Sequence, residues 1–379
     1  MALVLNEDQR LLKEAAVSFC RENVSLSNLR RLRDSRDPLG YDPEIWRQIV
    51  ELGWTGMTIP EAYGGFEFGY TGLGIVLEAT GRSLLNSPLI STVLLSSTAL
   101  NLGGSESQKQ EFLPAVVNGE LILALATEEL PHHAPTNIQT AAVSNGDGFV
   151  LNGKKVMVLD GHIADRFIVS ARSAGSRADQ DGISLFLVNA GSPGVIVRQT
   201  SMVDCRNAAT IVLDNVQVTS NALIGRLGQG YSVLEQVFDV GRIGLAAEML
   251  GSIQEVFERI VDYLKQREQF GVPIGAFQAL QHRAAVMYCE IELCKSAVLA
   301  ALDALDNDPS AVPELASLAK AKCSEVFFTV SNEGVQMHGG IGMTDEFDIG
   351  FFLKRARVAQ QFLGDQVFHR DRYASLRGF

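Results

Sequence analysis

A short segment in the C-terminal half of the chain could bind a phosphate and a flat ring together. The segment contains Arg267, Gln269, Phe270 and Gly271, and it follows a hydrophobic pattern of helical period that runs from Val256 to Lys265. A guanidinium forms paired hydrogen bonds to a phosphate, and an exposed aromatic ring can lie against another flat or charged group. The alternative is structural: Arg267 neutralises the end of its own helix, and Phe270 fills the turn to the next one. These residues alone leave both interpretations open.

A glycine-rich break between helical stretches forms a second candidate site. It contains Gln336, His338, Gly339, Gly340 and Gly342. Glycine lets the backbone approach a ligand closely, and the amides of such a segment can bind a pyrophosphate or the edge of a ring. Two adjacent glycines between helices are also a common turn. The break is therefore interpreted either as part of a binding site or as a plain turn.

An acid and a base lie three residues apart near the start of the first long C-terminal helix. They are Asp239 and Arg242, and their spacing places them on one helical face. Such a pair is commonly a solvated ion pair. The functional alternative is that the two residues bind the polar, phosphate-bearing part of a ligand.

The elements that position these residues follow in the order helices, strands, helices. Helical spacing of apolar residues extends to about Leu121, and short β-rich runs follow to about Gly228. The dipeptide Asn152-Gly153 between two such runs predicts a two-residue hairpin in a compact antiparallel domain. The helical period then returns and predicts a bundle of four or five helices. We expect three packed domains, at residues 1–121, 122–228 and 229–379.

Composition and charge narrow the class of protein. The 379 residues carry a formal charge of −12, with 32 Lys and Arg against 44 Asp and Glu, so neither nucleic acid nor an anionic membrane is an expected partner. Five cysteines without a CxxC pair indicate neither a disulfide framework nor a zinc site. The first ten residues lack a signal-peptide pattern, and no apolar run approaches a membrane span. We therefore expect a cytoplasmic protein.

Two adjacent histidines, His132 and His133, raise the question of a metal site. No further His, Cys or carboxylate stands at a suitable ligand spacing. We interpret the pair as part of a surface loop and expect no metal.

Two longer segments match sequence motifs of a known family. They read Arg267-Glu268-Gln269-Phe270-Gly271, followed by Phe277-Gln278-Ala279, and Gln336-Met337-His338-Gly339-Gly340-Ile341-Gly342-Met343-Thr344. With the order of elements, they resemble the acyl-CoA dehydrogenase family over nearly the full length of the chain. The resemblance implies an α+β fold of N-terminal helices, a central β-barrel and a C-terminal four-helix bundle. It also implies oligomers, usually tetramers built from dimers, with FAD lying across the subunit interface.

The resemblance implies a role for each candidate segment. Part of an FAD whose ring lies in the neighbouring subunit would be bound by seven residues: Arg267, Gln269, Phe270, Gln278, Gln336, Gly339 and Gly340. Asp239 and Arg242 would line the path of an acyl-CoA substrate. The implied activity is the α,β-dehydrogenation of an acyl-CoA thioester in lipid metabolism, by a flavoprotein oxidoreductase with electron-transfer flavoprotein as its acceptor.

The chain departs from the family where a base is needed. In the family, a carboxylate removes the α proton of the thioester while hydride passes to the flavin. The glutamate stands in a Tyr-Glu-Gly-Thr segment, which here reads Phe362-Leu363-Gly364-Asp365, or in some members at the position of Gly241. Neither Leu363 nor Gly241 can take a proton. Asp365 is the remaining carboxylate in the neighbourhood.

The segment that would hold the flavin ring is altered as well. The family motif Thr-Glu-Pro-Gly-x-Gly-Ser-Asp corresponds to residues 127–136, which lack the glycines and the serine of the motif. The Trp-Ile-Thr strand of the family corresponds to Met157-Val158-Leu159, where an aliphatic side chain replaces a hydroxyl. The chain is therefore predicted to hold its own flavin ring poorly.

The residues that would reach a neighbour's site persist, whereas those that would face the chain's own flavin are lost. The wording from Arg267 to Ala285 is most similar to small subunits of pimeloyl-CoA-type dehydrogenases and to base-lacking subunits of other heteromeric, α2β2 enzymes. The predicted function is that of a base-lacking subunit that completes the FAD site of a paralogous partner. Two alternatives stay open: a homo-oligomeric dehydrogenase with Asp365 as its base, and a non-catalytic acyl-CoA-binding scaffold.

Overall fold

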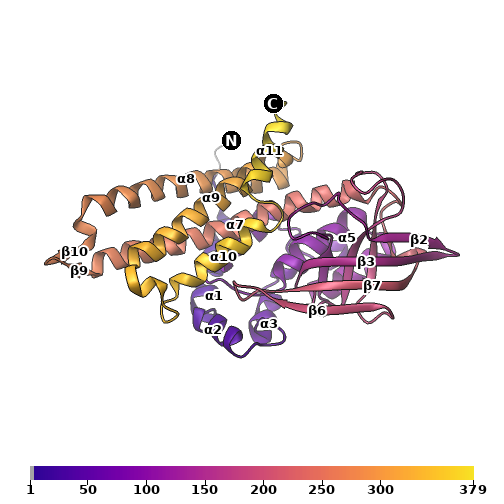
Figure 1. Cartoon of the computed structure of the whole chain (residues 1–379), viewed down its shortest axis with the longest axis horizontal. Helices are drawn as coiled ribbons and strands as arrows, with labels where there is room; N and C mark the ends of the chain where they lie inside the picture. The colour runs from indigo at the N-terminus through magenta and orange to yellow at the C-terminus, as the bar shows by residue number, and fades with distance from the viewer. Residues whose placement is uncertain (1–3) are drawn as a thin grey trace. The chain divides into compact units, whose positions relative to one another are not determined.

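A computed structural model of the chain describes residues 4–379 (Figure 1). Its backbone divides into two compact units. One unit comprises the described residues up to Arg31 together with Tyr70–Leu85 and Arg242–Phe379, and the other comprises Leu32–Gly69 and Asn86–Gly241. Within residues 4–379, no helix is long and apolar enough to cross a membrane.

From residue 4 onward, six α-helices precede the first strand, as the helical spacing of apolar residues predicts. Two of these helices begin with a capping box: Asn6 and Gln9 form one before the first helix, and Ser105 and Gln108 form another before the sixth. A buried π-helical segment, η3 (Leu89–Ser96), leads directly into the fifth helix. The helices are α1 (Glu7–Asn23), α2 (Leu26–Asp34), α3 (Pro43–Glu51), α4 (Tyr70–Arg82), α5 (Ser97–Gly103) and α6 (Glu106–Val117).

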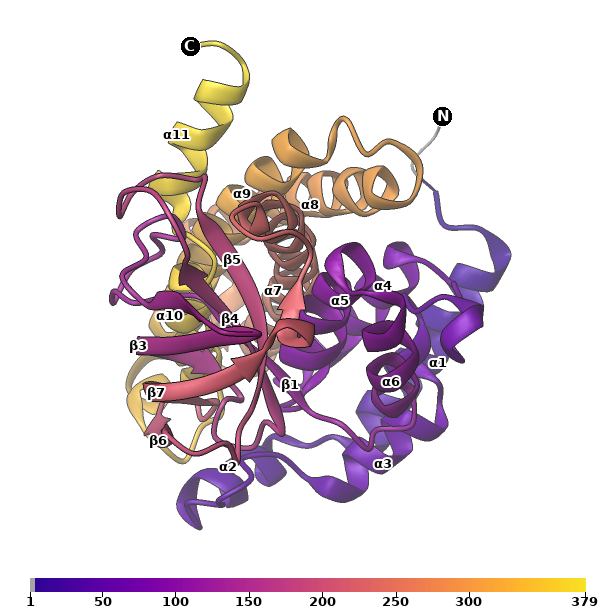
Figure 2. The ribbon, with the colours of Figure 1, turned by 90° about the vertical axis from the view of Figure 1, so that its right-hand side faces the viewer.

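The middle of the chain forms a sheet of eight strands in the order β6-β7-β3-β2-β4-β5-β8, with β1 beside β4 (Figure 2). Its core contains fully buried Phe167, Phe186 and Ile211. The strands are β1 (Leu123–Ala126), β2 (Ala141–Asn145), β3 (Gly148–Leu159), β4 (Arg166–Arg172), β5 (Ile183–Asn189), β6 (Val195–Ser201), β7 (Asn207–Thr219) and β8 (Leu223–Ile224).

The prediction of a purely antiparallel domain is wrong at two strand pairs. Strand β1 runs parallel to β4, with Leu123 opposite Arg166, and β2 makes one parallel pairing with β4. Strand β1 follows helix α6, so no tight hairpin constrains it to lie antiparallel to a neighbour in sequence. The remaining paired strands are antiparallel.

The predicted hairpin at Asn152-Gly153 is also wrong. Both residues lie inside the continuous strand β3, and the turn between β2 and β3 falls at Gly146, whose φ is +59°. The register against β7 shifts between Leu151 and Gly153, which marks a β-bulge. A Cβ at Gly153 would lie 2.3 Å from Oγ1 of Thr140, so this glycine signals a bulge and a close approach.

Long helices return after the sheet, as the helical period predicts, and their colours in Figure 1 run from salmon-pink at α7 through orange to yellow. Helix α9 packs against α8, α10 and α11. A small hairpin of β9 (Glu268–Gln269) and β10 (Val272–Pro273) separates the first two helices. The helices are α7 (Gly230–Gln266), α8 (Gln278–Asn307), α9 (Val312–His338), α10 (Ile349–Gln361) and α11 (Gln366–Leu376).

Candidate functional site

The hairpin after α7 projects Phe270 into solvent. Gln269 lies opposite Val272, and the two residues between them have left-handed backbones, with φ of +56° at Phe270 and +80° at Gly271. Two positive φ values in a two-residue loop match the twist of a hairpin. Because the Phe270 side chain is 93% exposed, it does not fill the interhelical turn. The structural alternative for this ring is therefore excluded.

The glycine-rich break follows the end of α9. Gln336 is exposed on the last turn of the helix, and Gly339 has a φ of +65°. A Cβ at either Gly339 or Gly340 would meet no atom within 4 Å. The backbone here faces open space, which is what a ligand that approaches main-chain atoms requires.

All seven predicted cofactor residues are exposed, and several contacts connect their segments. Phe270 and Phe277 meet edge to face at 6.1 Å between centroids, which joins the hairpin to the start of α8 and Gln278. Tyr263, one turn before Arg267, stacks on His338 at 4.3 Å between ring centroids. An exposed guanidinium, an exposed ring and an open glycine backbone fit the phosphate and base of a nucleotide. The exposed residues are Arg267, Gln269, Phe270, Gln278, Gln336, Gly339 and Gly340.

The predicted flavin loop, residues 127–136, and the residues that follow it as far as Thr140 are bonded to the chain's own carboxylates. One oxygen of Glu128 lies 2.5 Å from Nδ1 of His133, and the other accepts the N–H of Ala134 at 3.1 Å. The His133 side chain is only 3% exposed and meets the ring of Phe238 edge to face. The surface-loop interpretation therefore holds for exposed His132 but is wrong for His133.

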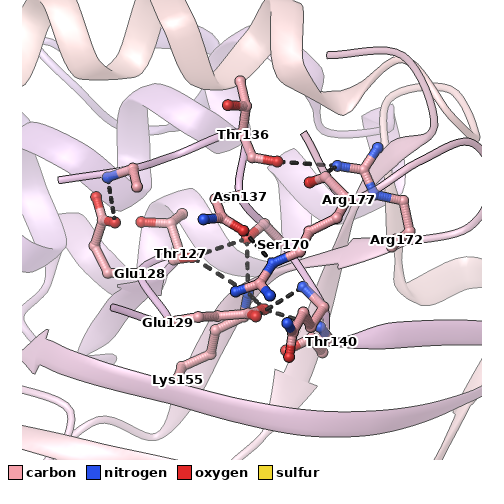
Figure 3. A network of polar contacts seen from close by, with 12 residues as sticks. Thr127, Glu128, Glu129, Thr136, Asn137, Thr140, Lys155, Ser170, Arg172 and Arg177 are labelled. Atoms are coloured by element: carbon pink, nitrogen blue, oxygen red, sulfur yellow. Dashed lines mark hydrogen bonds and ion pairs between the residues drawn. The ribbon is translucent and has the colours of Figure 1, made fainter. Parts of the chain in front are cut away.

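The neighbouring carboxylate, Glu129, closes the other side of the same loop (Figure 3). It accepts the N–H groups of Gln139 at 2.7 Å and Thr140 at 2.9 Å, and it accepts from Nζ of Lys155 at 2.8 Å. Lys155 also donates to the carbonyl of Thr127 at 3.2 Å. The three amides at Ala134, Gln139 and Thr140 are thus taken by this chain.

Lys155 is fully buried in strand β3. It donates to Oγ of Ser170 at 3.1 Å, in addition to its bond with Glu129. Burial lowers the pKa of Lys155 to about 8, although the Glu129 carboxylate opposes this change. For Glu129, burial alone would raise the pKa, but Lys155 and the two amides bring it below its ordinary value. The pair is therefore a buried ion pair in a closed loop, an arrangement that does not fit a flavin ring.

The ion pair between Glu129 and Lys155 was not predicted from the sequence. The available signal was a lysine in the middle of a β-rich run, where a charge needs a partner if it faces the core. A second signal was Glu129 itself, which stands where the family wording has proline.

The turn after α10 carries Leu363 at the position of the family's base. Leu363 is buried and has a φ of +60°. Its carbonyl oxygen accepts from Nε of Arg242 at 3.4 Å and contacts Nε2 of His369 at 3.0 Å. The next carbonyl, of Gly364, accepts from Nζ of Lys320 at 2.8 Å. Buried basic side chains on three helices therefore fix a turn that presents no carboxylate at residue 363.

The other candidate base positions also lack a readily available carboxylate. Gly241 lies buried within α7. Asp365 caps the N-terminus of α11, where one oxygen accepts the N–H groups of Val367 at 3.0 Å and Phe368 at 2.9 Å. Removing a substrate proton would compete with these bonds.

Asp239 and Arg242 are not a solvated pair. Their exposed fractions are 2% and 1%. The Arg242 guanidinium lies 5.5 Å from the ring centroid of Phe368, besides its bond to the Leu363 carbonyl. Across residues 4–379, no three His, Cys, Asp or Glu side chains gather as a metal site would require.

The fold is that of a flavoprotein oxidoreductase acting on acyl-CoA. The chain belongs to the acyl-CoA dehydrogenase family, whose members use FAD: it matches the N-terminal domain over residues 6–120, the middle domain over 124–216 and the C-terminal domain over 228–375. The resemblance to this family is confirmed. The chain is 30% identical over 371 residues to the probable short/branched chain specific acyl-CoA dehydrogenase of Dictyostelium discoideum, covering 95% of this chain and 87% of that protein.

Two solved structures are similar to this chain in both fold and sequence. A structure described as the Tcur3481-Tcur3483 steroid ACAD has a TM-score of 0.87 and 30% identity, with 98% of each chain covered. A chain of the ChsE4-ChsE5 complex from Mycobacterium tuberculosis has a TM-score of 0.89 and 25% identity, with 100% of each chain covered.

Proposed function

We propose that this chain is the base-lacking subunit of a heteromeric acyl-CoA dehydrogenase, in which it completes the FAD site of a paralogous partner. The observation that carries the proposal is an asymmetry within one chain. The segments at Arg267 and Gly339 are exposed and open, whereas the loop at Glu129 is bonded to itself. Both similar structures bear names that pair two proteins, which supports a heteromeric assembly.

Each residue set has a defined part in this proposal. When bound, FAD would supply the hydride acceptor for the β carbon of the acyl group, and the partner would supply the carboxylate that takes the α proton. This chain supplies the positive charge of Arg267 for the pyrophosphate and the ring of Phe270 for the adenosine. Gln269, Gln278, Gln336 and the Gly339–Gly340 backbone complete the polar contacts. Electron-transfer flavoprotein is the proposed acceptor.

Asp239 and Arg242 are proposed to line the acyl-CoA path. Their burial favours a permanent role in the wall of that path over a mobile surface grip. Steroid side-chain thioesters are the first substrates to test, because one similar structure is described as a steroid ACAD.

The homo-oligomeric alternative requires Asp365 to act as the base. One of its carboxylate oxygens already accepts two backbone N–H groups at the start of α11, so taking a substrate proton would compete with these capping bonds. The scaffold alternative predicts that no flavin binds with any partner. The exposed Arg267 and Gly339 segments argue against that alternative.

The deciding experiment measures flavin content and native mass. The chain is expressed alone and then together with a paralogous dehydrogenase subunit encoded beside it, and the visible absorption spectrum of each product is recorded. We expect no flavin in the chain alone and one flavin per pair in the complex. One flavin per chain in the protein alone would overturn the shared-site proposal, and absence of flavin from both products would favour the scaffold.

A further inference from the structure

Two residues inside the helical bundle join the two exposed segments. Tyr263 lies on α7 one turn before Arg267, and His338 is the last residue of α9, directly before Gly339. Their rings stack at 4.3 Å between centroids with planes 33° apart. The Tyr263 hydroxyl donates to the His338 carbonyl at 3.3 Å, and the N–H of Arg267 donates to the Tyr263 carbonyl at 2.8 Å. A continuous path of contacts therefore links Arg267 to Gly339.

The His338 side chain is buried in a single arrangement. Its Nδ1 lies 2.6 Å from the carbonyl oxygen of Gly334, so Nδ1 carries the proton and donates it. Its Nε2 is buried without a hydrogen-bond partner among residues 4–379. Burial lowers the pKa of His338, which keeps the ring neutral. A buried nitrogen without a hydrogen-bond partner lowers the stability of the folded chain. A role of the His338 ring in the binding of a ligand would explain why this cost is kept.

The opposite end of the glycine-rich segment is anchored from α2. Phe347 packs against His338 at 4.8 Å between centroids. Arg30 donates to Asp345 at 2.8 Å and to Asp348 at 3.0 Å, which lie on both sides of Phe347 in the sequence. The loop that follows Gly342 is therefore held at both of its ends.

We propose that Tyr263 and His338 are positioning residues that hold the two cofactor segments of this chain in one fixed arrangement. The hydroxyl of Tyr263 fixes the carbonyl of His338, and the planar peptide between His338 and Gly339 transmits that orientation to the glycine backbone. Gly339, the next residue, has a positive φ that residues other than glycine rarely adopt, so the backbone turns at this point. The inference rests on the proposed function, because FAD is the ligand that both segments would meet.

The test compares Tyr263→Phe with the wild type in the co-expressed complex. This variant keeps the stacked ring and removes only the hydroxyl bond. After removal of the flavin, FAD is titrated back, and the dissociation constant is expected to rise by about 2- to 10-fold, the range that one hydrogen bond supplies. Tyr63→Phe is the matched control, since it also removes one hydroxyl bond, from Tyr63 to Glu106. His338→Gln is the second variant, because it retains a donor for the Gly334 carbonyl.

A second readout separates positioning from general loss of stability. Amide hydrogen exchange of the chain alone is followed in the peptides that contain residues 267–271 and 336–344. Tyr263→Phe is expected to accelerate exchange in both peptides with an unchanged thermal midpoint. Unchanged FAD affinity, or weaker affinity without faster exchange, would overturn the positioning role. If the wild-type complex binds no FAD, the proposed function is wrong, and the inference is overturned with it because its ligand is missing. Weaker FAD binding in the variant alone is a different result, since the wild type then still binds FAD.

Discussion

Glu129 and Lys155 form a buried ion pair, 2.8 Å between oxygen and nitrogen, at the base of the loop that the family uses for its flavin ring. The same carboxylate accepts two backbone amides from the far side of that loop. One side chain therefore provides charge compensation and closes the loop.

Glu129→Gln should destabilise the chain strongly. It leaves the ammonium of Lys155 buried without a counter-charge, and breaking a buried pair on one side costs about 3 kcal/mol. Chemical denaturation measures the loss, with Glu111→Gln, an exposed acid on α6, as the control. The double variant Glu129→Gln with Lys155→Met should recover part of the stability, because it removes the unpaired charge while the glutamine oxygen can still accept a backbone N–H group. If Glu129→Gln behaves like the control, the pair is not a closing element.

Stability should depend on pH through Lys320. Burial, followed by the nearby Arg242, lowers the pKa of Lys320 to about 7, whereas an unfolded lysine titrates near its ordinary value of about 10.4. Between these values the unfolded chain binds a proton that the folded chain does not. The free energy of unfolding should therefore fall as the pH falls from about 10 to about 7, by up to about 1.4 kcal/mol per pH unit.

The variant Lys320→Met isolates this effect from other titrating groups. Its unfolding free energy should change less with pH over the same window than that of the wild type. Parallel pH profiles for the two proteins would show that Lys320 keeps its proton when folded.

Arg267→Ala should weaken the retention of FAD by the co-expressed complex. A hydrogen bond to a charged group contributes about 1.5 to 3 kcal/mol, which corresponds to a rise in dissociation constant on the order of 10- to 100-fold. Flavin content after gel filtration and a titration with FAD measure it. Arg370→Ala, which removes an exposed arginine paired with Glu325, is the control. Equal flavin content in wild type and Arg267→Ala contradicts the assigned role.

Asp365→Asn should leave the turnover of the complex unchanged. Asparagine also caps a helix well, so α11 should keep its start and the protein its stability. The homo-oligomeric alternative makes the opposite prediction, because an amide cannot take the α proton. Steady-state turnover of an acyl-CoA substrate, with the thermal midpoint recorded beside it, distinguishes the two.

Much of the fold follows from local patterns in the sequence. The period of apolar residues predicts the helices on both sides of the sheet, and the wording at Arg267 and Gly339 predicts two segments that the structure presents to solvent. These features depend on residues within a few turns of one another. The parallel strand β1 could not be predicted in this way, because its partner β4 lies more than forty positions away in the chain, as the pairing of Leu123 with Arg166 shows.

The closed loop was hidden for the same reason. Glu129, Lys155 and Ser170 come from separate stretches and meet only through the pairing of the strands. Asn152-Gly153 was misleading because the dipeptide that favours a tight turn also suits a bulge, and local sequence does not separate the two.

The backbone bonds at the Leu363 turn bear on how a catalytic carboxylate can be lost during evolution. Its bonds to Arg242, His369 and, through Gly364, to Lys320 all use main-chain oxygens, so they are indifferent to which side chain stands at residue 363. After duplication of an ancestral gene, one copy can lose its proton acceptor by a single replacement while its product still folds. In the proposed heteromeric enzyme, the gene of the partner would then have to supply the carboxylate, and selection would act on the two genes as one unit.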